Sequence, residues 1–310
     1  MQLIRNIYNL PQNLIKRGCA LTIGNFDGVH LGHQAVLKHL CEKANSLNLP
    51  TLVMLFEPQA NEYFMGENAP ARLMRLRDKL NALAQHEIDY VFCVKFNRTF
   101  AKQSAEQFVD DWLVQKLKVK FLSIGDDFRF GANRCGDFAL LQRKATQFGF
   151  QVENNHSFQL NEQRISSTAI RKALAEDNLI LAKQLLGKPY CIHGKVIHGN
   201  KLGRTIGFPT ANIRLQRQVN PIRGVYIVKV KLEDNTFFNG VANIGKRPTL
   251  NGIKQLLEVH LFDFNEDLYG QTLQIEFCQK IRDEIKFPSF DHLKKQIEQD
   301  VKIAKDYFSV

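Results

Sequence analysis

The sequence predicts two domains: a doubly wound α/β domain with a parallel sheet, then a small antiparallel β-barrel with a C-terminal helix. A chain of 310 residues is long enough for two domains. The first half alternates short apolar runs with helical patterns, whereas the second half carries short β-rich runs separated by turn-forming residues. The change of character near residue 186 divides the chain into expected domains at 1–186 and 187–310.

The first domain is expected to be a Rossmann-like sandwich. Its apolar runs predict strands at 20–23, 51–56, 90–94 and 121–124, and the intervening periodicity predicts helices that include 71–86 and 104–116. Ligands of such sheets bind beyond the carboxyl ends of the strands. The glycine-punctuated turn at 24–28 falls at such an end.

The second domain begins after two predicted helices at 168–174 and 179–186. Short β-rich runs follow at 191–197, 225–232, 237–244, 256–264 and 273–277, which indicates a small antiparallel barrel. The chain closes with an amphipathic helix for which Ser289 is the expected N-cap, because apolar residues recur at steps of three or four from Phe290 to Phe308.

The composition is that of an ordinary globular protein, with 44% hydrophobic residues. No apolar stretch is long enough for a membrane helix, and the N-terminus lacks the apolar core of a signal peptide. The six cysteines form no Cys-x-x-Cys pair, so the sequence indicates neither a zinc site nor a disulfide framework. We therefore expect a cytoplasmic protein with free thiols.

The net charge of +11 is unevenly distributed. Residues 178–232 contain ten Lys and Arg residues and no Asp or Glu, which suits nucleic acid, a membrane surface or an anionic small substrate. This segment lacks a run of adjacent basic residues and is rich in glycines and apolar strand residues. It therefore favours a polyphosphate pocket, and we expect neither nucleic acid nor a membrane as a partner.

The turn after the first predicted strand carries two histidines at the start of a helical pattern. Gly24 and Gly28 allow a tight turn, which places His30 and His33 near a helix N-terminus. Free amide groups and the helix dipole favour an anion there, and imidazoles can hydrogen-bond the charge that develops on a phosphoryl oxygen. The pattern predicts a site for an ATP phosphate. The alternative is that one histidine caps the helix and the other lies in an interface.

Two further segments of the first half suit phosphate chemistry. Residues 164–171 present hydroxyls at a predicted helix start between two arginines, and guanidinium groups and hydroxyls suit a pyrophosphate. A simple Ser/Thr helix cap has the same pattern. Asp126 and Asp127 follow a predicted strand, where paired aspartates are also common turn residues.

The run Gly-Asn-Phe-Asp-Gly-Val-His-Leu-Gly-His at 24–33 resembles the signature of the HxGH nucleotidylyltransferases, in the form found in bacterial bifunctional FAD synthetases. Residues 125–131 and 164–171 resemble two further motifs of that family. The resemblance implies adenylyl transfer from ATP to the phosphate of FMN, giving FAD and pyrophosphate. It implies His30 and His33 as catalytic residues, an ATP site of Gly24, Phe26, Asp27, Arg164, Ser166, Ser167, Thr168 and Arg171, and flavin or nucleotide contacts at Asn25, Asp126, Asp127 and Phe128. One departure is Ala60, where the family commonly has a proline.

A glycine-rich segment in the second half has a different chemistry. Glycines at 199, 203 and 207 let a backbone approach phosphates, while Thr210 and Asn212, two residues apart, can aim oxygen ligands the same way. This is not a Walker loop. It resembles the riboflavin kinase motif that ends in Pro-Thr-Ala-Asn. The resemblance implies Mg²⁺ held by Thr210 and Asn212, and ATP contacts at Gly199, Lys201, Gly203, Arg204, Gly207 and Pro209.

Phosphorylation of a ribityl hydroxyl benefits from a carboxylate that accepts its proton. Glu258 lies on an otherwise apolar predicted strand and shares a face with Leu256, His260 and Phe262 by a period of two. A solvated edge-strand glutamate is the alternative. The resemblance to riboflavin kinase implies Glu258 as the catalytic base, and it makes Arg282 and Phe287 candidate flavin or nucleotide contacts.

The resemblance covers nearly the whole chain. It predicts an enzyme that phosphorylates riboflavin to FMN with ATP and then adenylylates FMN to FAD, with ATP, riboflavin, FMN and FAD as ligands and a divalent cation as cofactor. Two alternatives remain. One is an HxGH nucleotidylyltransferase with another phosphate acceptor, and the other is a basic nucleic-acid-binding regulatory protein on a retired enzyme scaffold.

Overall fold

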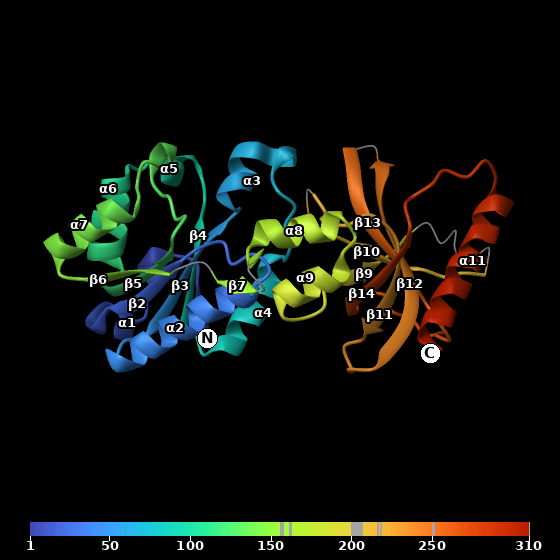
Figure 1. Ribbon diagram of the computed structural model, residues 1–310, viewed down its shortest axis with the longest axis horizontal. Coiled ribbons are helices and arrows are strands. Elements are labelled where there is room, and N and C mark those ends of the chain that lie inside the picture. Colours follow the sequence, from blue (N-terminus) through green and yellow to red (C-terminus); the bar gives the residue numbers. More distant parts are fainter. Residues whose placement is uncertain are drawn as a thin grey trace. The chain divides into compact units, whose positions relative to one another are not determined.

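The computed structural model describes residues 1–155, 158–160, 163–199, 207–215, 217, 219–249 and 252–309 (Figure 1). The chain forms two compact units. The first unit comprises Met1–Pro70 and Met74–Ser167, and the second comprises Ala71–Leu73 and Thr168–Val310.

The first unit is built on a six-stranded sheet in the order β1-β4-β3-β2-β5-β6, and every strand pair is parallel. The predicted parallel sheet is therefore confirmed, and strands β1 and β6 extend it beyond the predicted four. The strands are β1 (Gln2–Ile4), β2 (Cys19–Ile23), β3 (Thr51–Glu57), β4 (Tyr90–Lys95), β5 (Val119–Gly125) and β6 (Gln151–Asn155).

The strand order reverses beside β2. From β2 the chain moves outward through β3 to β4, and it then returns to place β5 on the other side of β2. Loops that leave neighbouring strands at such a switch point diverge and leave a crevice for ligands. The loops after β2 and β5 carry two of the three predicted motifs of this unit.

Helices cover both faces of this sheet (Figure 1). Alternate strand residues supply the two cores, so that Leu21 and Met54 lie on one side and Ala20 and Val53 on the other. The helices are α1 (Gln12–Arg17), α2 (Leu31–Ser46), α3 (Ala60–Met65), α4 (Leu76–Leu83), α5 (Arg98–Ala101), α6 (Ala105–Gln107) and α7 (Phe138–Phe148), with the π-helix η4 (Phe108–Lys116) after α6. Short 3₁₀ turns are η1 (Ile7–Asn9), η2 (Gly66–Asn68), η3 (Ala84–His86) and η5 (Ala132–Arg134), and a small hairpin pairs β7 (Gln159–Leu160) with β8 (Gln163–Arg164).

Two predicted helices differ in detail. The helix predicted over 71–86 begins only at Leu76, where α4 starts, and ends in η3. Residues Ala71–Leu73 instead belong to the second unit, where arginines bind their carbonyl groups: Arg171 Nε donates to Ala71 O at 2.6 Å and Arg217 donates to Arg72 O at 3.2 Å. The helix predicted over 104–116 is α-helical only in its first turn, α6, and continues as the π-helix η4.

The second unit is a closed six-stranded barrel in the order β10-β13-β12-β11-β14-β9, with antiparallel pairing throughout. The predicted barrel is confirmed, and β10 completes it. Its interior is filled by side chains such as Ile213, Val228 and Leu257, which are fully buried. The strands are β9 (Cys191–Ile197), β10 (Ala211–Arg214), β11 (Gly224–Lys231), β12 (Phe237–Thr249), β13 (Gly252–Leu261) and β14 (Thr272–Arg282).

Helices α8 (Ser167–Ala175) and α9 (Leu179–Leu186) group with the barrel from Thr168 onward. Asp177, in the turn between them, accepts hydrogen bonds from Tyr226 Oη at 2.8 Å and from Lys280 Nζ at 2.7 Å. Burial, and then the hydrogen bond to Asp177, raise the pKa of the Tyr226 hydroxyl. The change in composition after residue 186 does not reveal these contacts, and the division of activities at that point stays a prediction.

The C-terminal helix α11 (Phe290–Phe308) packs on the outer face of the barrel (Figure 1). Ser289 caps it as predicted, with its side chain accepting from the His292 amide. Ala304 is fully buried in a cluster with Ile227 and Phe262.

The buried Asp300 side chain of α11 binds the guanidinium group of Arg282 through Nε at 3.0 Å and Nη2 at 2.7 Å. Arg282 ends β14, so this pair attaches α11 to the barrel.

Among the described residues, no helix is long and apolar enough to cross a bilayer. All six cysteines, which lie within the described ranges, are free thiols in the structure. Burial raises the pKa of the Cys19 thiol to about 12 and that of Cys191 to about 11, so both stay protonated near neutral pH.

Replacing Asp300 with asparagine should lower the free energy of unfolding of the second unit by about 3 kcal/mol, because it leaves the Arg282 cation without its buried counter-charge. The control is Asp306→Asn on the same helix, where the side chain is exposed. Urea unfolding of both variants checks this expectation. Equal midpoints for the two variants would contradict it.

Candidate functional site

His30 and His33 form a stacked pair at the start of α2. His30 is the N-cap, and its Nδ1 accepts from the His33 amide at 3.3 Å. The two rings lie 3.6 Å apart between centroids, with 18° between their planes. Because Nδ1 of His30 accepts, the proton of its neutral ring is on Nε2, which makes that atom a donor for an anionic oxygen. His30 therefore caps the helix through Nδ1 and carries its ring proton on Nε2.

The loop that leads to this pair has an unusual backbone. Phe26 and Val29 have φ angles of 46° and 41°, in the left-handed region that disfavours larger side chains, and Gly28 has φ 89°. Both side chains are buried, which holds the loop in place against this strain. The Phe26 ring lies 4.9 Å from that of His33, and a Cβ on Gly24 would stand 3.2 Å from the Phe26 ring. The Phe26 ring of this loop therefore packs against His33 and restrains the histidine pair on that side.

Asp27 joins this loop to Ser167, the first residue of α8, and to Met74. Its carboxylate is buried and accepts from the Met74 amide at 3.0 Å, while its main-chain oxygen accepts from Ser167 Oγ at 2.9 Å. A Cβ on Gly32 would lie 3.4 Å from the carbonyl oxygen of Ile165. The 24–33 motif and the beginning of the 164–171 motif are thus in direct contact within the first unit.

Arg164 brings the third motif to the same place. Its Nη2 lies 2.9 Å from Asp126 Oδ1 and 3.3 Å from Asp127 Oδ2, just beyond the carboxyl end of β5. Phe128 packs its ring on that of Phe130, with centroids 5.4 Å apart. No sequence pattern indicates that this arginine and these aspartates pair.

The remaining predicted residues of this site are more scattered. Asn25 is exposed on the β2 loop and Ser166 is partly buried. Thr168 and Arg171 belong to the second unit, where Arg171 binds Ala71 O.

An aromatic cluster that no sequence pattern predicted lies at the carboxyl ends of β3 and β4. Phe96 lies at its centre, with ring centroids 6.0 Å from Phe56, 5.4 Å from Tyr63 and 5.7 Å from Phe64. Tyr63 and Phe64 are 40% and 67% exposed. Such exposure of large rings beside a strand end indicates a surface for a flat apolar ligand, but exposure cannot be read from a sequence.

Ala60 is the first residue of α3, at the position in a helix that proline also favours. The capping box between Gln59 and Glu62 is intact. The departure from the family's proline is therefore accommodated without a change of helix start.

In the second unit, Glu258 lies between two asparagines on the outer face of the barrel. It pairs in register with Asn212 of β10 and with Asn243 of β12. The flanking Leu257 and Val259 fill the interior, so the period of two places Glu258 on the outside. Three polar side chains thus form a row across three adjacent strands.

Asn212 is held tightly, with 6% of its surface exposed. Its Nδ2 donates to Thr210 O at 3.3 Å. A Cβ on Gly199 would lie 2.3 Å from Asn212 Nδ2, so only glycine lets the carboxamide occupy this position. Gly199 thus makes room for Asn212, a different reason from the close approach of a phosphate that the sequence suggested.

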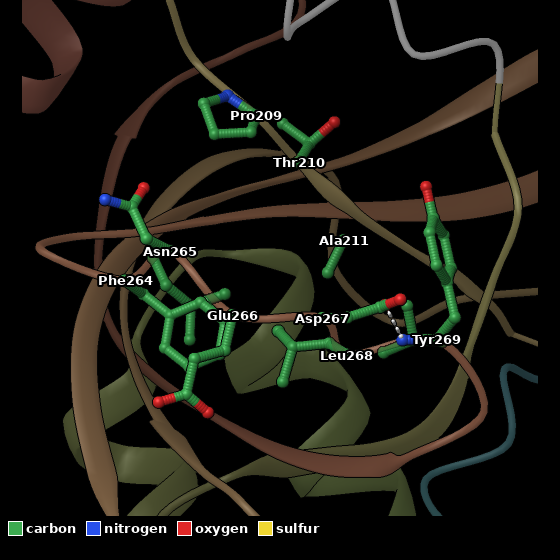
Figure 2. Close-up of a pocket in the computed structure, with 11 residues that line it drawn as sticks. Pro209, Thr210, Ala211, Phe264, Asn265, Glu266, Asp267, Leu268 and Tyr269 are labelled. Atoms are coloured by element: carbon green, nitrogen blue, oxygen red, sulfur yellow. Dashed lines mark hydrogen bonds between the residues drawn. The ribbon is translucent and has the colours of Figure 1, made fainter.

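A cavity of about 490 Å³ opens beside Thr210 and is called the barrel pocket below. Figure 2 shows Pro209 and Thr210 on one side of it and the loop from Phe264 to Tyr269 on the other. The ring of Tyr269 lies 3.9 Å from that of His198. The residues of this loop match no ligand-binding pattern, so the sequence alone did not indicate a site here.

The other predicted residues of this unit are placed as follows. Gly207 has φ 88°, in the left-handed region where glycine is favoured. Arg282 is bound to Asp300, and its guanidinium group lies 5.7 Å from the centroid of the Phe287 ring. Lys201, Gly203 and Arg204 lie outside the described residues. Within the described part of the chain, no group of three or more His, Cys, Asp or Glu side chains is placed to hold a metal ion.

Two protein-family models match this chain, one in each half, in the same order as the two sets of motifs. A family model described as FAD synthetase matches residues 12–169, and one described as riboflavin kinase matches residues 186–308. A solved structure titled as a macrolide-efflux protein from Streptococcus pneumoniae has the same fold over 98% of both chains, with a TM-score of 0.79 and 29% sequence identity.

Full-length relatives agree with both family models. The bifunctional riboflavin kinase/FMN adenylyltransferase of Haemophilus influenzae is 66% identical over 309 residues, covering 100% of both chains. The protein of that name from Escherichia coli K12 is 54% identical over 310 residues, covering 100% of this chain and 99% of its own. The chain therefore belongs to the family of bacterial bifunctional riboflavin kinase/FMN adenylyltransferases, which phosphorylate riboflavin to FMN and adenylylate FMN to FAD.

Proposed function

We propose that adenylyl transfer takes place beyond the carboxyl ends of β2 and β5, with His30 and His33 as the catalytic residues. The observation that carries this proposal is the stacked pair at the α2 N-terminus, where Nε2 of His30 is a donor. A phosphate oxygen of FMN attacks the α-phosphorus of ATP, and the bond to pyrophosphate breaks. FMN phosphate is already an anionic nucleophile, so the histidines need only bind the charge that develops on the α-phosphoryl oxygens.

The rest of the ATP site follows the three motifs. Gly24, Phe26 and Asp27 shape the loop, and Arg164 with Ser166 and Ser167 would bind the departing pyrophosphate. Thr168 and Arg171 stay predictions for the same role. Arg164 is held by Asp126 and Asp127 before ATP binds, so these carboxylates orient its guanidinium group.

The aromatic cluster of Phe56, Tyr63, Phe64 and Phe96 is the proposed surface for the isoalloxazine ring of FMN. Exposed rings beside the same sheet edge support this assignment. Asn25 and Phe128 stay predicted contacts of flavin or nucleotide.

In the second unit, Glu258 is the proposed base for riboflavin phosphorylation. Its carboxylate accepts the proton of the ribityl 5′-hydroxyl as the oxygen attacks the γ-phosphorus of ATP, and ADP leaves. Its place on the outer face, between Asn212 and Asn243, gives a substrate access that the filled interior does not allow.

The residues around Glu258 fit a Mg²⁺ ion that is bound with ATP. Thr210 and Asn212 offer oxygen donors, which Mg²⁺ prefers, and Asn212 is already fixed by Gly199 and Thr210. When bound, the ion neutralises charge on the transferred phosphoryl group. Few protein ligands suffice, since Mg²⁺ in such sites keeps waters and phosphate oxygens.

The barrel pocket, beside Thr210, is the proposed place for the nucleotide of ATP. Gly199 lies against Asn212 and Pro209 lines the pocket beside Thr210, which supports their predicted part in this site, whereas Gly207 stays a prediction. Lys201, Gly203 and Arg204 stay predictions, as do Arg282 and Phe287 for the flavin. The free thiols suit a reducing compartment, and the cytoplasm stays the proposed location.

Separate variants should remove the two activities one at a time. We expect Glu258→Gln to lower riboflavin phosphorylation by about 10²- to 10⁴-fold, because no other group takes the hydroxyl proton. We expect His30→Ala/His33→Ala to lower FAD formation from FMN by at least about 10²-fold. The measurement is separation of riboflavin, FMN and FAD over time with Mg-ATP.

Each variant is the control for the other, since the unaffected reaction reports the amount of active protein. Glu298→Gln, on the exposed face of α11, is a matched charge control for Glu258→Gln. Normal FMN formation by Glu258→Gln would refute its role as base.

Gly199→Ala should weaken the kinase reaction alone. The added methyl group displaces the Asn212 carboxamide, so we expect the Mg²⁺ concentration for half-maximal FMN formation to rise several-fold, as one metal ligand is lost. The control is Gly125→Ala in the first unit, where the new Cβ would meet its nearest atom, Asp127 Oδ1, at the ordinary contact distance of 3.4 Å. An unchanged Mg²⁺ requirement in Gly199→Ala would contradict this account.

A further inference from the structure

His260 makes a contact to the main chain that the reaction scheme does not use. It lies on β13 two residues beyond Glu258, and its Nδ1 is 2.8 Å from Pro209 O. A carbonyl oxygen only accepts, so Nδ1 carries the proton and donates. The neutral ring is thereby fixed as the Nδ1–H tautomer.

This contact stands where the β10–β13 ladder ends. Pairing runs from Arg214 with Leu256 to Ala211 with Val259, and in that register Thr210 comes next, opposite His260. The ladder does not continue to Thr210. The side chain of His260 replaces the missing main-chain bond by binding the carbonyl group of Pro209, which has no amide hydrogen of its own to donate.

The surroundings hold the ring in this position. Phe208 and Phe262 contact it edge-on, with centroids at 5.4 Å and 5.9 Å. Burial lowers the pKa of His260 despite the favourable bond to Pro209, and the Lys305 charge lowers it further. The ring therefore stays neutral near neutral pH and keeps its single N–H on the carbonyl group.

We propose that His260 is a positioning residue of the kinase site, which fixes the Pro209–Thr210 peptide relative to Glu258. This inference rests on the proposed roles of Thr210 and Glu258. Glu258 and His260 are two residues apart on one strand and share a face, so the hydrogen bond ties the segment that carries Thr210 to the strand that carries the base. His260 acts through the backbone and touches no reacting atom.

Three substitutions separate this role from simple packing. Asparagine carries its amide nitrogen on Cγ, as histidine carries Nδ1, so His260→Asn keeps a donor in reach of Pro209 O. Glutamine places its nitrogen one bond farther out, and leucine has none. We expect His260→Asn to keep kcat/KM for Mg-ATP within about threefold of the parent, and His260→Gln and His260→Leu to lose about tenfold, the effect of one hydrogen bond.

The loss should appear in kcat/KM for Mg-ATP and not in the KM for riboflavin or in FAD formation. The KM for riboflavin should change less than twofold, and FAD formation from FMN should be unchanged in the same preparations. A packing role predicts the opposite order, with glutamine, the closest in size to histidine, best tolerated. Equal losses in His260→Asn and His260→Leu, or no loss in His260→Leu, would overturn the proposal.

A double-mutant cycle with Thr210→Val tests whether His260 acts through Thr210. If it does, His260→Leu should cost much less in the Thr210→Val background than in the parent. Additive losses would overturn the proposal. The single variant Thr210→Val tests the proposed role of Thr210 separately from that of His260. Full kinase activity in Thr210→Val would refute the role of Thr210, whatever the effect of His260→Leu in the parent.

Discussion

The alternation of side chains along β-strands decides where chemistry is possible in both units. In the parallel sheet, helices cover both faces, so alternate residues such as Ala20 and Leu21 are buried on opposite sides, and the 24–33 and 125–131 motifs lie at strand ends. In the closed barrel, one set of residues fills the interior, and the polar row that includes Glu258 has to lie on the outer face. The same period therefore gives an edge site in one unit and a surface site in the other.

Both sites use main-chain geometry to hold polar side chains in place. In the loop after β2, Phe26 and Val29 have left-handed conformations. This loop leads to the two stacked imidazoles at the N-terminus of α2. On the barrel, Gly199 leaves the space that the Asn212 carboxamide fills. In each case small or strained residues are found beside a side chain that we propose as functional, and a side chain fixed before substrate binds has a low reorganisation cost.

Ion pairs in this chain have distinct structural consequences. Arg164 faces two aspartates at an exposed strand end, and since such exposed pairs cost little to break, its guanidinium group is free to take the phosphate-binding role that we propose. Arg282, by contrast, binds the buried Asp300 and attaches α11 to the barrel, and breaking that pair would leave a charge without compensation. The motif pattern alone does not distinguish an arginine for ligands from one that holds the fold.

The sequence by itself determined the two folds, the order of the units and the motifs with His30, Asn212 and Glu258, because periodicity and glycine spacing are local properties. Only the tertiary structure decided which motifs meet. The pairing of Arg164 with Asp126, the aromatic cluster around Phe96 and the bond from His260 to Pro209 all join segments far apart in the chain. Such contacts depend on strand order and register, and a one-residue change of register would place the same side chains on opposite faces.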